Sequence, residues 1–108
     1  MYDGLELANV VAAGAAALAA AVEAELAEVV SIVAIKVARE KMESAAMAPW
    51  DLAVILEADW VIDAAKAAME ASVMRQEEAC VAALVAAEAA EAAAIATEAE
   101  MRRLSGEK

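Results

Sequence analysis

The chain has 108 residues, a length that suits one domain, and a formal net charge of −11. This acidic balance excludes nucleic-acid binding, which needs clustered cations, and disfavours anionic membrane surfaces. Alanine, the best helix former, supplies 35 of the residues, and alternating strand patterns are absent. The composition therefore predicts an all-α protein.

The first predicted helix spans about residues 4–46. Asp3 followed by Glu6 forms a capping-box pattern at its start, with acidic side chains at the positive end of the helix. Gly14 lies inside this helix and costs about 1 kcal/mol relative to alanine. We explain this glycine by close backbone approach of a neighbouring helix.

A tight turn at about 47–49 and a second helix at about 50–104 complete the predicted elements. Pro49 suits the first position of the second helix, where Asp51 faces the exposed N–H groups. Ser105-Gly106 is a stop signal that ends this helix.

Folding about the turn predicts a single helical domain, residues 1–108, built as an antiparallel helical hairpin of two long helices. An alternative is a break near Gly14 or at 72–75, which gives shorter helices in a single-chain bundle. A core made mainly of alanine buries little apolar area per residue, so a small domain of this kind gains stability by association. We expect a homo-oligomer, with a dimer that completes a four-helix bundle favoured.

Apolar residues at helical spacing predict which faces of the two helices meet. In the first helix the predicted stripe is Val11, Ala15, Leu18, Val22, Leu26, Val29, Val33 and Val37. In the second helix it includes Leu56, Trp60, Ala67, Ala71, Met74, Glu78, Ala82 and Val85. The predicted cross-hairpin pairs are Val29–Ala67, Leu26–Ala71, Val22–Met74, Leu18–Glu78 and Val11–Val85. A polar stripe on the second helix faces solvent in this scheme and includes Asp59, Asp63, Lys66, Glu70, Glu77, Glu88, Glu91 and Glu98.

Two apolar stretches approach the length of a membrane-spanning helix. Residues 7–22 carry no charge, and residues 79–97 carry only Glu88 and Glu91. Alanine contributes little to membrane insertion, and two carboxylates near the bilayer centre are costly. The acidic start also differs from a signal peptide. We therefore expect a soluble chain that does not enter membranes.

The absence of histidine restricts the chemistry. It removes Ser-His and Cys-His nucleophilic pairs and all His-containing metal sites, and a Gly-rich phosphate loop is also missing. The carboxylate pairs Glu88/Glu91 and Asp59/Asp63 belong to the solvated polar stripe. We interpret Cys80 as a small apolar residue that fills space between packed side chains. We expect no metal and no cofactor.

A few less common residues remain as candidates for a site. Trp60 could line a small apolar pocket with Leu56, Val33 and Met74, although a core anchor is the simpler interpretation of a lone tryptophan. Glu78 falls on the predicted apolar stripe, where burial would raise its pKa and let it act as a base or hold a ligand, or it could be a rim residue in an oligomer. Lys36 lies between Ile35 and Val37, where a desolvated amine could form a Schiff base, but its helical position favours a surface lysine.

The sequence resembles de novo designed helical bundles. The features that carry the resemblance are the near-absence of loop sequence, the Ala/Glu block at 86–94, the Asp3/Glu6 cap, the Pro49 helix start and the Ser105-Gly106 stop. The resemblance covers the whole chain and implies a helical bundle, but it assigns no site residues. A weaker likeness is to WXG-type secreted helical hairpins, whose glycine is missing from Trp50-Asp51-Leu52.

These observations favour a structural function. The main expectation is a designed, self-assembling helical bundle without catalytic activity. The alternative is a designed binding module that holds a small, largely apolar ligand near Trp60 and Met74. An enzyme that uses Lys36 or Glu78 is the third interpretation.

Overall fold

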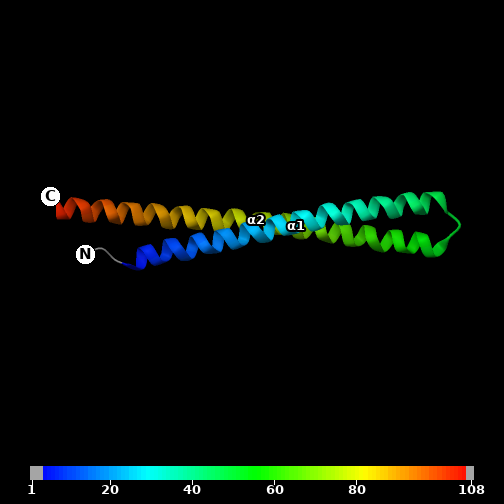
Figure 1. The fold of residues 1–108 in the computed structure, drawn as a ribbon, viewed down its shortest axis with the longest axis horizontal. Coiled ribbons are helices and arrows are strands. Elements are labelled where there is room, and N and C mark those ends of the chain that lie inside the picture. Colours follow the sequence, from blue (N-terminus) through cyan, green and yellow to red (C-terminus); the bar gives the residue numbers. More distant parts are fainter. Residues whose placement is uncertain (1–3, 107–108) are drawn as a thin grey trace. The chain divides into compact units, whose positions relative to one another are not determined.

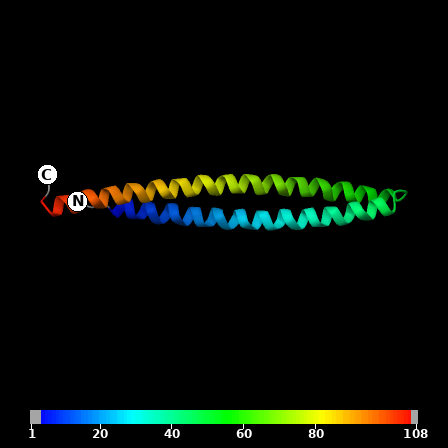
Figure 2. The ribbon, with the colours of Figure 1, turned by 90° about the horizontal axis from the view of Figure 1, so that it is seen from above.

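The computed structural model describes residues 4–106, and within this range it is helical without strands. Helix α1 spans Gly4–Met47 and helix α2 spans Leu52–Leu104. The chain divides into a terminal unit, Met1–Ala21 with Glu77–Lys108, and a turn unit, Val22–Gln76. In each unit a segment of α1 packs antiparallel to a segment of α2, as both views show (Figures 1 and 2). The predicted all-α fold with two long packed helices is confirmed.

The turn differs from its prediction by a few residues. Pro49 and Trp50 lie in the turn rather than in the second helix, which begins at Leu52. Asp51 is the N-cap of α2 because its Oδ1 accepts hydrogen bonds from the backbone N–H groups of Ala53, at 3.1 Å, and Val54, at 3.4 Å. Proline fixes the backbone ahead of the cap, whereas the carboxylate determines where the helix starts.

The cap leads to a stability prediction. We expect Asp51→Ala to lower the free energy of unfolding by about 1 kcal/mol, because it leaves two N–H groups of the first turn without their acceptor. Chemical denaturation followed by circular dichroism measures the change. Asp51→Asn keeps an acceptor oxygen and is the control. Equal losses in the two variants would contradict the capping role.

The end of α2 agrees with the predicted stop. Gly106 has a φ of 83°, and its N–H donates to the carbonyl of Arg103 at 3.2 Å. This is the left-handed conformation that glycine adopts without a steric penalty at helix ends. At the other end of the chain Asp3 lies outside the described residues, whereas Glu6 lies in the first turn of α1.

Neither helix is broken at the positions that the alternative fold required. Helix α1 runs without interruption through Gly14, and helix α2 runs without interruption through residues 72–75. A Cβ added at Gly14 would meet no atom within 4 Å. Within the hairpin the other helix therefore does not come close to this glycine, and contact with α2 does not explain it.

Open space at Gly14 predicts a stabilising substitution. We expect Gly14→Ala to raise the free energy of unfolding by about 0.5–1 kcal/mol, because alanine fits the helix without a clash and loses less backbone entropy on folding. Thermal and urea unfolding would measure the gain. A loss of stability would show that the glycine has a packing role.

The interior of the turn unit is a seam of small side chains. Among the residues whose burial the structure describes, six are buried, and all lie in this unit: Ala24, Ser31 and Ala38 on α1 and Ala58, Ala65 and Ser72 on α2. In each helix they are separated by seven residues, which is the repeat that keeps one seam of a coiled coil facing its partner. Side chains of this size allow two helix backbones to approach closely.

Hydrogen bonds satisfy the two buried serines of the seam. Ser31 Oγ donates to the carbonyl of Glu28 at 2.7 Å, and Ser72 Oγ accepts from Gln76 Nε2 at 3.3 Å. Both serines therefore occupy alanine-sized positions without leaving an unpaired hydroxyl in the seam.

The predicted contact faces are wrong. The large members of the first stripe, from Val11 to Val37, are exposed, as are Leu56, Met74 and Val85 in the second. Their proposed cross-hairpin partners Ala67, Ala71 and Glu78 are exposed as well. Alanine and serine form the contact instead, because a seven-residue repeat of small side chains gives a closer antiparallel fit than the larger stripe does.

Two ion pairs connect the helices of the turn unit beside the seam. Lys41 Nζ lies 2.8 Å from Glu57 Oε1, and Arg75 Nη1 lies 3.6 Å from Glu23 Oε2. In each pair the two residues are equally far from Pro49 in sequence. Both pairs therefore correspond to the same antiparallel register of the two helices. The four side chains are partly exposed, so we expect the pairs to set register more than stability.

Candidate functional site

Large apolar side chains lie on the outside of both units. On α1 of the turn unit they include Val22, Leu26, Val29, Ile32 and Val33, and on α2 of the same unit Leu56, Trp60, Met69, Val73 and Met74. The terminal unit exposes Leu7, Val11, Leu18, Val81, Leu84, Val85, Ile95 and Met101. Exposed apolar patches on this scale are typical of protein–protein or membrane contact surfaces.

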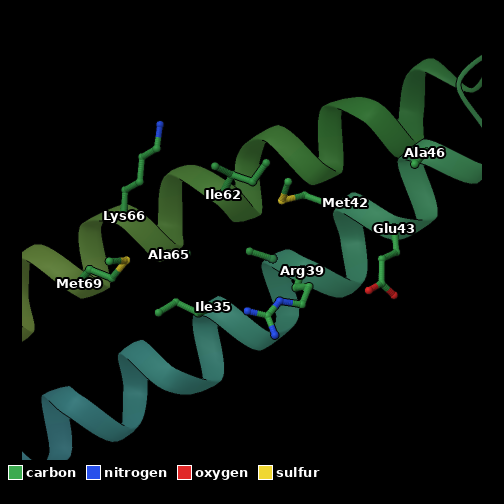
Figure 3. A pocket seen from close by; sticks show the side chains of 10 residues that line it. Ile35, Arg39, Met42, Glu43, Ala46, Ile62, Ala65, Lys66 and Met69 are labelled. Atoms are coloured by element: carbon green, nitrogen blue, oxygen red, sulfur yellow. The ribbon is translucent and has the colours of Figure 1, made fainter.

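An apolar groove of about 510 Å³ lies between α1 and α2 in the turn unit. Its walls are Ile35 and Met42 from α1 and Ile62 and Met69 from α2 (Figure 3). The seam residues Ala38 and Ala65 line it as well. Arg39, Glu43 and Lys66 stand at its edges, and Figure 3 shows Lys66 pointing away from it. The groove is open and can accept an apolar group, but it presents no converging set of polar side chains.

The residues predicted to line a ligand pocket do not line this groove. Trp60, with 73% of its surface exposed, Leu56 and Val33 are exposed outside it. Met74 lines a separate, shallow recess with Met69, Glu70 and Val73. The interpretation of Trp60 as a core anchor is wrong, because the tight alanine seam has no room for an indole ring.

Neither candidate for acid–base or amine chemistry is buried. Glu78 is exposed, so its predicted burial on an apolar stripe is wrong. Lys36 is also exposed and borders a second shallow recess with Ile32, Ile35 and Arg39. The prediction of a surface lysine is confirmed. Among the described residues Lys36 forms no ion pair.

The thiol and an ion-paired carboxylate of the terminal unit offer no catalytic site either. Cys80 is exposed and free, so its interpretation as an apolar filler is wrong. In the terminal unit the Arg103 guanidinium donates to Glu100 and thereby lowers the pKa of this carboxyl group, whereas the pKa of Arg103 is raised by the same contact. Residues 4–106 contain no group of three or more His, Cys, Asp or Glu side chains that could hold a metal ion.

Among the residues that the structure describes, one helix, α2, is long and apolar enough to cross a membrane. An 18-residue window within α2 has a mean hydropathy of 1.8, and none of it is buried in the structure. The predicted polar stripe of α2 is exposed along its length, so its carboxylates accompany this apolar stretch. Length and composition alone satisfy this criterion, and the core helix of a soluble protein also passes it.

Sequence reasoning missed the groove and the outward position of the large stripes. The signal that could have found them was the seven-residue repeat of Ala24, Ser31 and Ala38 and of Ala58, Ala65 and Ser72. Placing that seam between the helices puts Ile35, Met42, Ile62 and Met69 beside it by helical geometry.

No protein-family model, curated protein or solved structure matches the chain. The function therefore has to be inferred from the arrangement of its faces.

Proposed function

We propose that the chain is a structural protein, a self-associating helical bundle without catalytic activity, of the designed kind that its composition resembles. A dimer of two hairpins that forms a four-helix bundle is the simplest assembly. It uses no metal or cofactor.

The accessible surface is the observation that carries this proposal. The chain exposes 7935 Å². A folded monomer of 11.1 kDa exposes about 5,700 Å² by the usual scaling of surface with mass. The difference, roughly 2,200 Å², is larger than the roughly 800 Å² that each partner buries in a standard interface. A second copy can therefore cover the excess area.

The distribution of side chains supports the same assembly. Alanine and serine occupy the buried seam, and the large apolar side chains lie outside it. Covering apolar surface stabilises by about 25 cal/mol per Å², and the seam alone covers little of it. The outward Val, Leu and Met side chains are thus available to the contact between copies.

The expected partner is a second copy rather than nucleic acid or a membrane. The net charge of −11 repels phosphate groups. The outward acids of α2, among them Glu77, Glu91 and Glu98, would face lipid if this helix crossed a bilayer. In an aqueous bundle the same carboxylates remain hydrated and keep an apolar chain in solution.

Light scattering after size exclusion tests the proposal. We expect a mass of twice 11.1 kDa that falls toward the monomer mass on dilution, with helicity preserved above the dissociation midpoint. Added salt should tighten the dimer because it screens the repulsion between acidic copies. A folded species of 11.1 kDa at every concentration would overturn the proposal.

The groove in the turn unit supports a second candidate, a module that binds a small apolar ligand. Its volume of about 510 Å³ falls in the range of small-molecule sites, and Ile35, Met42, Ile62 and Met69 form its walls. Fluorescence enhancement of anilinonaphthalene sulfonate tests this candidate. Binding that Ile62→Ser abolishes and Trp60→Ala leaves intact would favour the groove over the site first predicted near Trp60.

A further inference from the structure

The outward faces of the two helices differ in the turn unit. In each helix the seam residues are seven apart. At 3.6 residues per turn, the position five residues after one seam residue, which is also two before the next, lies on the side of the helix opposite the seam. On α1 this position is Val29, and its neighbours on the same face are Leu26, Ile32 and Val33, all exposed by more than half. On α2 the equivalent position is Asp63, followed seven residues later by Glu70, and both are exposed.

This difference assigns distinct environments to the helices. A helix that is apolar all round belongs inside a bundle, whereas a helix with one charged face belongs at its surface. From Val22 to Val33 the face of α1 that points away from α2 carries one charge, Glu25. We call Leu26, Val29, Ile32 and Val33 the outer α1 face. It is a continuous apolar surface that needs covering, whereas the outer face of α2 has Asp63 and Glu70 between exposed apolar side chains such as Trp60.

Charges of opposite sign stand at the two ends of the outer α1 face. Glu25 directly precedes it, and Lys36 follows it by three residues. Glu25, Lys36 and the neighbouring Arg39 are exposed, and none of the three forms an ion pair among the residues that the structure describes. An antiparallel copy of the same helix would set each Glu25 opposite the partner's Lys36, whereas a parallel copy would bring like charges together.

We propose that two copies of the chain associate through the outer α1 face, α1 against α1 and antiparallel, so that α1 is the inner helix and α2 the outer one. This inference rests on the proposed self-association and specifies its contact. The patch is self-complementary, as a two-fold symmetric interface requires. The midpoint of Glu25 and Lys36 falls between Val29 and Ile32, which places apolar side chains at the two-fold axis.

Charge reversal tests the contact by sedimentation equilibrium of the full chain. We expect Glu25→Lys to weaken the dimer about tenfold, because the new lysine meets the partner's Lys36 twice by symmetry. Lys36→Glu should weaken it less, since Arg39 remains. The double variant should recover most of the wild-type affinity. All the sites are exposed, so helicity should not change.

If net charge alone determined the affinity of the dimer, Glu25→Lys would strengthen it rather than weaken it. This variant is less acidic than the wild type, so reduced repulsion between copies would tighten the dimer. Asp63→Lys changes the charge equally on the outer face of α2 and is the matched control, for which we expect no weakening. Weakening by Glu25→Lys but not by Asp63→Lys therefore supports the inferred contact.

Cysteine cross-linking tests the orientation in a Cys80→Ser background. Val29→Cys lies near the two-fold axis and should cross-link through a short bismaleimide. Val22→Cys should not, because an antiparallel copy places the two thiols about 25 Å apart along the helices. Cross-linking of both variants would indicate a parallel pair and overturn the inference.

The remaining outcomes separate the two proposals. If neither charge reversal changes the affinity of the dimer, the proposed self-association stands but the α1 contact is overturned. A chain that remains monomeric refutes both. If such a monomer co-sediments with phosphatidylcholine vesicles, the chain binds lipid rather than a second copy and the inference is wrong.

Discussion

Replacing Ala65 with leucine is expected to lower the free energy of unfolding by about 2–3 kcal/mol. Ala65 is one of the six buried seam residues, with 6% of its surface exposed. Its neighbours in the seam repeat, Ala58 and Ser72, are equally small and buried. A leucine at this position can be accommodated only if the two helices move apart, which reduces the contact along the whole turn unit. Urea denaturation followed by circular dichroism measures the loss.

Ala67→Leu is the matched control for this substitution. Ala67 lies two residues away on the same helix but is exposed, and the change adds the same side-chain volume at nearly the same cost in helix propensity. We expect a change within about 0.5 kcal/mol in this variant. If the two variants lost the same stability, close packing of the seam would not be what holds the hairpin together.

The helical fold could be predicted from composition, but the contact between the helices could not be predicted from size. Alanine content and sparse turn residues were sufficient for two long helices. The prediction that the stripe from Val11 to Val37 forms the contact between the helices assumes that the largest apolar residues face inward. Burial of apolar residues is a one-way rule, and in this chain the smallest ones face inward.

The helix boundaries show where local signals compete. Pro49 and Asp51 both favour a helix start, and two hydrogen bonds to the Asp51 side chain decide in favour of Leu52 as the first residue of α2. Gly14 looked like a contact residue because glycine is rare in this chain. No neighbouring residue in the sequence indicates that the space around it within the hairpin is open.

The candidate site was harder to predict for a similar reason. Trp60 is one of two tryptophans, Glu78 falls on the predicted apolar stripe and Lys36 lies between two apolar residues, but all three are exposed. The groove is instead lined by Ile and Met residues that composition does not distinguish from any other core residue. Glu25 and Lys36 indicate an antiparallel contact only when the position of the seam is known, because the seam shows which face of α1 points away from α2.

A charge at the centre of the outer α1 face has the second large expected effect. We expect Val29→Asp to raise the dissociation constant of the dimer at least about 100-fold, because the two-fold axis brings two carboxylates together in an apolar contact. Val29 is 57% exposed in the hairpin and lies opposite the seam, so the helix content should remain that of the wild type. Sedimentation equilibrium and circular dichroism on the same samples separate dissociation from unfolding.

Ala67→Asp adds the same charge on the outer face of α2 and should leave the dimer nearly intact, because this face stays hydrated in the proposed bundle. The comparison decides between two origins of any weakening. General repulsion between chains that already carry a net charge of −11 would affect both variants alike. Desolvation of a carboxylate in the contact would affect Val29→Asp alone. A Val29→Asp chain that dimerises as tightly as the wild type would remove α1 from the interface, whatever assembly the protein forms.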